Sequence, residues 1–362
     1  MKIQMLMNQS IIFLLFLAVL CSCSSPSDGG YRHEETNGVY YWKTVLAPSS
    51  RDCSFMLRHE VGRIYLRMFD VTVEDWNTSA TFEKVVPNAS VRMPSDGEQS
   101  AAELLNAKRV VPVVYVTVEA LKAAKGLEGQ LASLMVERVR RMCRYYELTS
   151  VEGLQVDCDW TVSTEQSFFS LCDSLRSQMA QRGLRWALSS TIRLHQLARK
   201  APPVDYGVLM VYNTGSFSNP DARNSIISME DVDPYLDRLP AYPLHLDVAY
   251  PTYSWQLLFR NRLFVALLNG LNVADTACFA AAGKNCHRAL VNVIYHGRLI
   301  RRGDIVRTEE SAPKEVLAVK DAIERRLSTR RHSNILYHLD QKNLSKYTAD
   351  EINRLYSTQG RD

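Results

Sequence analysis

The regular alternation of two kinds of segment is the feature that most constrains how this chain can fold. Short runs rich in β-branched and aromatic residues alternate with stretches that carry apolar residues at helical spacing, a pattern typical of a parallel sheet with crossover helices. The runs predict eight strands, near residues 38–46, 63–71, 110–117, 153–160, 186–191, 206–213, 244–250 and 334–340. Because a closed (β/α)8 barrel needs eight strands, we predict an α/β fold with a single TIM-type barrel over residues 38–362.

One interval between the predicted strands is too long for a helix and its loops. Residues 256–332 separate the seventh strand from the eighth, so they must carry an insertion beyond a minimal barrel repeat. Within this insertion we predict a helical run over 257–271 and a strand or a helix over 290–299. A further helix is predicted from Pro313 to about residue 327, because proline is common in the first turn of a helix.

Capping patterns mark two other helices. Ser163 and Gln166 form a capping-box pattern ahead of the helix between the fourth and fifth strands. Thr348 and Glu351 form a second one, which predicts a terminal helix through about residue 356.

The first 22 residues have the pattern of a secretory signal peptide. Lys2 precedes ten apolar residues, 11–20, which rise only about 15 Å as a helix and so suit a signal peptide better than a membrane span. The segment Leu20-Cys21-Ser22-Cys23 resembles a bacterial lipobox, which predicts lipidation of Cys23, a flexible tether over 23–37 and anchoring of the exported chain to a membrane of the bacterial cell envelope. An ordinary cleaved signal peptide is the alternative.

Charge and motifs exclude several classes of function. The net charge of +4 is nearly balanced for 362 residues, and no basic run is interleaved with aromatic residues, so no nucleic-acid partner is predicted. No GxSxG, HExxH, Walker or GxGxxG motif is present, and the cysteines form no zinc-ligand pattern, so we predict no cofactor and no metal. Whether Cys278 and Cys286 form a disulfide is left open by their spacing. We expect a monomer.

The fourth predicted strand carries the residues with the clearest chemical potential. Its alternation places Gln155, Asp157 and Asp159 on one face, which would point into the barrel near the end where such barrels hold their active sites. Two carboxyl groups on Cα atoms about 6.6 Å apart are close enough for the charge of one to favour the protonated form of the other. Asp159 is therefore a candidate general acid with Asp157 beside it. The alternative is that both aspartates only hydrogen-bond neighbouring strands.

Aromatic and polar residues near the ends of other strands suggest a sugar-binding cleft. A pyranose offers an apolar face for stacking and hydroxyl groups for hydrogen bonds, although each aromatic residue could instead pack in the core. The histidines, including His195 and His245, are interpreted as structural residues. The predicted substrate-binding residues are Gln155, Tyr212, Asn213, Asp247, Tyr250, Trp255 and Trp42.

These motifs resemble those of the chitinase and endo-N-acetylglucosaminidase-like glycoside hydrolases, within a family of bacterial barrel lipoproteins. Glu152-Gly-Leu-Gln-Val-Asp-Cys-Asp159 resembles the fourth-strand signature Asp-Gly-x-Asp-x-Asp-x-Glu, and Met210-Val-Tyr-Asn213 and Asp247-Val-Ala-Tyr-Pro251 resemble the sixth-strand and seventh-strand motifs. The resemblance implies a general-acid role for Asp159, while Asp157 and Tyr212 would hold the acetamido group of the substrate.

The chain departs from the family pattern at several of these positions. Asp159 stands where the family has glutamate and is about 1.5 Å shorter, and Gln155 and Asn213 replace two acids. The eighth strand lacks the tryptophan of the usual sugar site. Three hypotheses follow: a glycoside hydrolase acting on a glycan, a non-catalytic barrel that binds a glycan, and a structural or interaction lipoprotein.

Overall fold

The structure is a computed structural model, and it describes residues 34–74, 81–93, 98–328 and 331–358. The predicted signal peptide, Cys23 and the tether as far as residue 33 lie outside the described residues. Among the helices that are described, none combines the length and the apolar composition that a membrane crossing requires.

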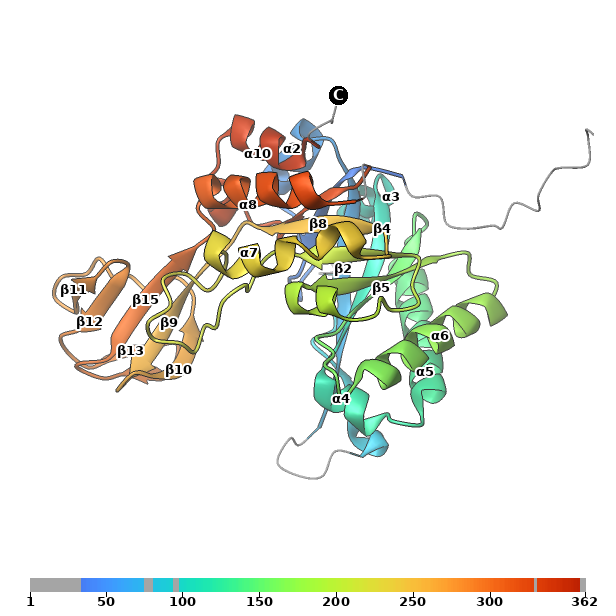
Figure 1. The fold of residues 1–362 in the computed structure, drawn as a ribbon, viewed down its shortest axis with the longest axis horizontal. Coiled ribbons are helices and arrows are strands. Elements are labelled where there is room, and N and C mark those ends of the chain that lie inside the picture. The colour runs from blue at the N-terminus through green and yellow to red at the C-terminus, as the bar shows by residue number, and fades with distance from the viewer. Residues whose placement is uncertain (1–33, 75–80, 94–97, 329–330, 359–362) are drawn as a thin grey trace, which may run out of the picture. The chain divides into compact units, whose positions relative to one another are not determined.

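Eight parallel strands form a closed barrel (Figure 1). The ring closes because β1 pairs with both β2 and β16 in parallel. This confirms the predicted fold class and all eight predicted strands. The barrel strands are β1 (Asn37–Tyr41), β2 (Val61–Val73), β4 (Arg109–Val116), β5 (Gly153–Asp157), β6 (Ala187–Arg193), β7 (Tyr206–Met210), β8 (Leu246–Pro251) and β16 (Asn334–Tyr337).

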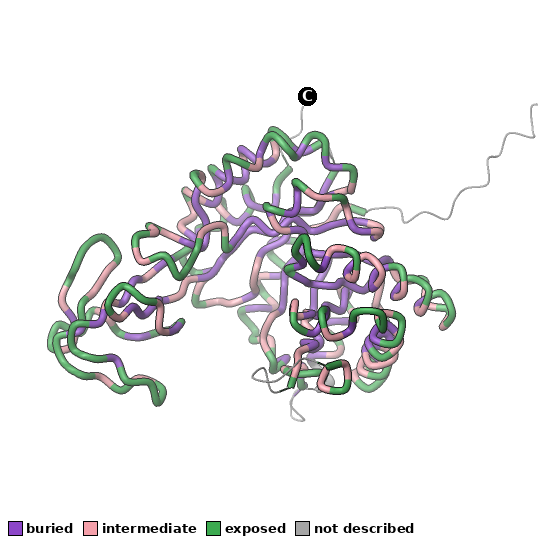
Figure 2. Tube along the Cα trace, turned by 60° about the horizontal axis from the view of Figure 1, so that its bottom comes forward, coloured by how far each residue is buried: buried purple, intermediate pink, exposed green. Residues whose placement is uncertain are grey.

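Helices cover the outside of the barrel, and the strands between them are largely buried (Figure 2). A short additional strand, β3 (Val85–Asn88), pairs antiparallel with the end of β2. The helices are α2 (Ser50–Arg58), α3 (Glu98–Asn106), α4 (Val118–Ala123), α5 (Glu128–Tyr145), α6 (Glu165–Gln181), α7 (Met229–Leu236), α8 (Pro313–Arg326), α9 (Gln341–Leu344) and α10 (Ala349–Tyr356).

One predicted helix cap is confirmed and the other is wrong. Thr348 and Glu351 form the capping box that opens α10. The helix after β5 is capped at Thr164 rather than Ser163, and no side-chain cap bond is made to the helix. The Thr164 hydroxyl instead accepts a hydrogen bond from the backbone N–H of Thr161 at 2.9 Å. This hydroxyl is therefore used in the turn before the helix and not as a helix cap.

The insertion between β8 and β16 is a small antiparallel sheet, and the helical run predicted over 257–271 is wrong. These residues form a hairpin of β9 and β10, whose turn residues Asn261 and Arg262 have φ values of 49° and 65°. Two consecutive positive φ values are typical of a tight β-hairpin turn. The insertion contains β9 (Ser254–Arg260), β10 (Leu263–Leu268), β11 (Phe279–Gly283), β12 (Cys286–Ala289), β13 (Val293–Tyr295), β14 (Arg298–Ile300) and β15 (Ile305–Glu310).

The apolar residues of the insertion build a core of their own. Leu258, Leu268, Ile300 and Val306 pack together with other buried residues of this sheet. The long apolar run is therefore explained by two extended strands, of which β9 buries four consecutive residues. Cys278 and Cys286 are free thiols in this sheet.

Candidate functional site

Gln155 lies inside the barrel, beneath its open end. Its side chain is fully buried, accepts a hydrogen bond from the Tyr40 hydroxyl at 2.6 Å and donates one to Ser189 at 3.3 Å. Tyr40 stacks on Tyr65, whose hydroxyl meets that of Tyr206. Gln155 is thus one member of a hydrogen-bonded interior layer, and its amide has its partners within the protein.

Asp157 lies one layer closer to the mouth, where β5 runs beside β6. Its carboxylate accepts hydrogen bonds from Thr191 at 2.6 Å and from the Arg193 guanidinium at 3.0 Å. Burial, together with the negative charge of Asp157, raises the pKa of Tyr115 on β4 to about 12. The Tyr115 hydroxyl consequently stays protonated over the physiological range and is a hydrogen-bond donor.

Asp159 follows the end of β5 and faces solvent. Its side chain is 54% exposed, whereas Asp157 is almost fully buried. Arg193 Nε lies 3.9 Å and His195 Nε2 lies 3.6 Å from the same Asp159 carboxylate oxygen. Arg193 therefore contacts both carboxylates and places a positive charge beside each of them.

The sequence analysis missed Arg193 and interpreted His195 as structural. The signal was present, because Thr191 and Arg193 are polar positions two residues apart at the end of β6, where the alternation that singled out Asp157 applies equally. His195 follows in a short 3-10 helix, and this turn brings it beside Asp159.

Aromatic rings meet at the mouth of the barrel around Tyr337, a residue that the sequence analysis did not single out. Tyr212 stacks on Tyr337 at 4.5 Å between ring centroids, and Trp42 lies 5.6 Å away from it. Tyr253 meets both Tyr212 and Tyr337 edge-on. Arg67 lies over the ring of Trp42 at 5.3 Å. Tyr337 and Trp42 are only partly buried, so aromatic surface is open to a ligand.

A cavity of about 770 Å³ opens beside this cluster. One wall comes from the insertion and the other from the segment after β16, so the insertion enlarges the mouth of the barrel on one side. Asp157 and Asp159 are not among the residues that line it. The polar lining residues include Asn213, Gln256, Asn269, Asn272, Thr308, His338, Asp340, Lys342 and Asn343, and the aromatic ones are Tyr253, Trp255 and Tyr337.

Hydrogen bonds fix two of the predicted residues at this cavity. The Trp255 indole N–H donates to Glu309 at 2.7 Å, and Asn213 accepts a hydrogen bond from the Tyr253 hydroxyl at 2.6 Å. Burial first, and then the charge of Asp157, raise the pKa of Tyr337, which lines the cavity. The structure thus brings Trp42, Tyr212, Asn213 and Trp255 to one end of the barrel.

Asp247 and Tyr250 do not lie at this mouth. Asp247 is fully buried near the start of β8, where it accepts a hydrogen bond from the backbone N–H of Ser333 at 2.7 Å. Tyr250 is fully buried, and this burial, followed by the charges of Glu324 and Asp321 on α8, raises its pKa. The alternation explains this, because Tyr250 shares the outward face of Val248. We leave both residues out of the candidate site.

Among the residues that the structure describes, no group of three or more histidine, cysteine, aspartate or glutamate side chains is placed so that it could hold a metal ion.

No protein-family model matches the sequence, and the comparison with curated proteins returned no match. Among solved structures, catalytic domain 2 of the group II chitinase of Ostrinia furnacalis superposes with a TM-score of 0.51 at 11% identity, covering 90% of this chain and 96% of that one. The chain has the fold of the chitinase barrels.

Two weaker neighbours have related descriptions. The spore cortex-lytic enzyme SleL of Bacillus cereus gives a TM-score of 0.49 at 10% identity, over 91% of this chain and 77% of that chain. A family 18 N-acetylglucosaminidase of Paenibacillus barengoltzii gives 0.45 at 10% identity, over 89% and 100%. At these identities the likeness concerns the fold alone.

Proposed function

We propose that the protein binds a glycan at the open mouth of its barrel. The observation that carries this proposal is the gathering of Trp42, Tyr212, Trp255 and Tyr337 beside a cavity of about 770 Å³ whose lining is otherwise rich in amides and charged groups. Aromatic rings offer faces for stacking on sugar rings, and side-chain amides both donate to and accept from hydroxyl groups. The cavity volume is in the range of ordinary ligand sites.

The class of glycan that we propose contains N-acetylglucosamine. The Ostrinia furnacalis chitinase domain was solved in complex with penta-N-acetylchitooctaose, and the motifs of β5 and β7 resemble those of enzymes for such sugars. In this proposal Asp157 and Tyr212 meet the acetamido group, and Tyr337 lies between that point and the wider cavity.

Hydrolysis is the second candidate function, and the position of Asp157 and Asp159 at the end of β5 favours it. A glycosidase needs a carboxyl group that is kept protonated, which an apolar surrounding or a neighbouring carboxylate achieves. Asp159 instead lies half exposed, with Arg193 and His195 as its neighbours. We therefore place binding ahead of hydrolysis.

Chito-oligosaccharide binding by the full chain tests the proposal. We expect calorimetry to show saturable binding and Trp42→Ala to weaken it about tenfold or more, which is about 1.4 kcal/mol. Tyr145→Ala is the matched control, because Tyr145 is an exposed aromatic residue of α5, outside the barrel. Circular dichroism verifies that each variant is folded.

Release of reducing ends, measured in parallel, separates the two candidate functions. Turnover by the wild type that Asp159→Asn abolishes while binding is kept would favour the hydrolase. Binding without turnover supports the binding protein. Equal affinities of the wild type and Trp42→Ala, or no binding of any oligosaccharide in the series, would contradict a glycan site at this mouth.

We also propose that the chain is exported and anchored in the bacterial envelope by a lipid on Cys23. The lipobox-like segment 20–23 supports this. In a bacterial host, Cys23→Ser should move the chain from the membrane fraction to the soluble fraction, because the lipid anchor is lost. Mass spectrometry of the N-terminal peptide checks the modification directly. An unmodified Cys23 on a membrane-bound wild-type chain would disprove the anchor.

A further inference from the structure

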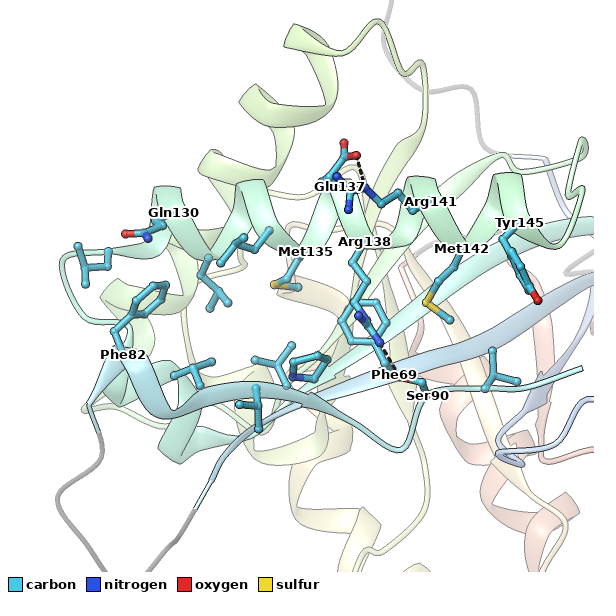
Figure 3. Close-up of a pocket in the computed structure, with 18 of the residues that line it drawn as sticks. Phe69, Phe82, Ser90, Gln130, Met135, Glu137, Arg138, Arg141, Met142 and Tyr145 are labelled. Carbon is cyan, nitrogen blue, oxygen red and sulfur yellow. Dashed lines mark hydrogen bonds and ion pairs between the residues drawn. The ribbon is translucent and has the colours of Figure 1, made fainter.

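A long apolar groove runs along α5, on the outside of the barrel and away from the candidate glycan site (Figure 3). It has a volume of about 940 Å³ and lies between α5 and the strands β2 and β3. The 18 residues of α5 extend about 27 Å. Its apolar lining residues include Phe69, Val71, Phe82, Val85, Val91, Leu131, Leu134, Met135, Met142 and Tyr145.

Three arginines line this groove, and one of them, Arg138, reaches across it from α5. Figure 3 shows it pointing toward β2 and β3, where its guanidinium lies over the Phe69 ring at 5.1 Å and donates to Ser90 at 3.0 Å. Its Nε is buried and has no hydrogen-bond partner. Among the residues that the structure describes, no carboxylate forms an ion pair with Arg138.

The nearest acid in sequence is already committed to other arginines. Glu137 lines the groove but pairs with Arg140 and Arg141 at 2.9 and 2.7 Å. A guanidinium among apolar groups costs free energy when no anion compensates its charge. Arg141 is therefore compensated by Glu137, whereas Arg138 adds to the long apolar surface a positive charge that no carboxylate of the described residues meets.

We propose that this groove binds a fatty acid of about 12 carbons, with its carboxylate on Arg138 and its acyl chain along the apolar lining. Arginine binds carboxylates through charge-assisted hydrogen bonds, and a bound carboxylate would compensate the charge of Arg138. The longer arm of the groove runs from Arg138 past Met135 to Phe82. Arg138 lies ten residues from Glu128, the first residue of α5, which is about 15 Å along the helix. An extended 12-carbon chain is of about the same length.

Dodecanoate is the probe that tests this proposal, with calorimetry of the full chain as the measurement. We expect one saturable site, and we expect Arg138→Met to weaken binding at least tenfold, because methionine keeps the apolar contact with Phe69 and removes the charge. Dodecan-1-ol, which lacks the carboxylate, should bind the wild type as weakly as dodecanoate binds this variant. Arg144→Met is the matched control, since Arg144 is an exposed residue of α5 that does not line the groove.

A second variant keeps the test independent of Arg138. Leu134 lines the groove but is 58% exposed, so Leu134→Glu should fold and repel the carboxylate. Equal dodecanoate affinities for the wild type and both groove variants would overturn the proposal, and so would the absence of saturable binding. A dimer in sedimentation that Leu134→Glu dissociates, without fatty-acid binding, would instead assign the groove to a second copy of the chain. None of these outcomes bears on the proposal that the barrel mouth binds a glycan.

Discussion

Arg63→Met is expected to destabilise the protein by about 3–5 kcal/mol, because it removes one partner of a buried ionic cluster. Arg63 is 1% exposed at the start of β2. Its guanidinium forms a hydrogen-bonded ion pair with Glu152 and lies 3.8 Å from the Asp247 carboxylate. It also donates hydrogen bonds to the Ser333 hydroxyl at 3.3 Å and to the backbone carbonyl of Glu34 at 3.1 Å. The variant would leave the fully buried Asp247 carboxylate without this positive charge, while methionine fills much of the space.

Unfolding in guanidinium chloride measures this loss. Arg58→Met is the control, because Arg58 is exposed on α2 and should change the free energy of unfolding by no more than about 0.5 kcal/mol. The double variant with Asp247→Asn removes both charges, and the asparagine oxygen can still accept the Ser333 N–H. The double variant should therefore lose less free energy of unfolding than the sum of the single losses. Additive losses, or a loss below about 1 kcal/mol for Arg63→Met, would show that the cluster is not coupled as described.

Glu309→Leu is the second substitution with a large expected effect, and it acts on both stability and the glycan site. Glu309 on β15 is 1% exposed and accepts from Arg307 at 2.7 Å and from the Trp255 indole at 2.7 Å. It also accepts a hydrogen bond from the hydroxyl of Ser225, in the loop before α7. Arg307, itself buried, donates to the backbone carbonyls of Asn219 and Pro220 in the same loop. Glu309 therefore ties the insertion to the barrel.

The leucine variant would leave Arg307 as a buried charge without its carboxylate, which costs about 3–5 kcal/mol. It would also free the Trp255 indole, so chito-oligosaccharide affinity should fall about tenfold at a temperature where the variant is folded. Glu309→Gln keeps an acceptor for the indole and should lose stability but retain more of the affinity. The control is Glu310→Gln, a neighbouring exposed residue. Unchanged glycan affinity in Glu309→Leu would remove Trp255 from the proposed site.

The barrel could be predicted from the sequence because its signals are local. Each strand is a short apolar run between turn residues, and the alternation along β5 assigned Gln155 and Asp157 to the interior without knowledge of any neighbour. The same alternation did not say how far along a strand a residue lies from the mouth. Asp247 therefore joined the predicted site although it lies near the start of β8, next to Arg63.

Contacts between segments far apart in the chain could not be predicted. Tyr337 contacts the aromatic rings of Tyr212 and Trp42 only because β16 pairs with β1 and β8 and so closes the barrel. Arg193 reaches Asp157 and Asp159 because β5 and β6 pair in one register. In the insertion, the apolar run over 257–271 was compatible with a helix or with two strands. In the structure it forms strands, and β9 also pairs with β15, a contact between distant segments of the chain.

The sequence by itself determined the number and order of the barrel strands, because hydrophobic periodicity and turn residues act over a few positions. Tertiary structure alone decided which polar residues stand at the mouth, which are buried beneath it, and which charge each carboxylate meets. The physical reason is that the surroundings of Asp159, Trp255 and Arg138 are built from side chains that only strand pairing and helix packing bring within a few ångströms of them.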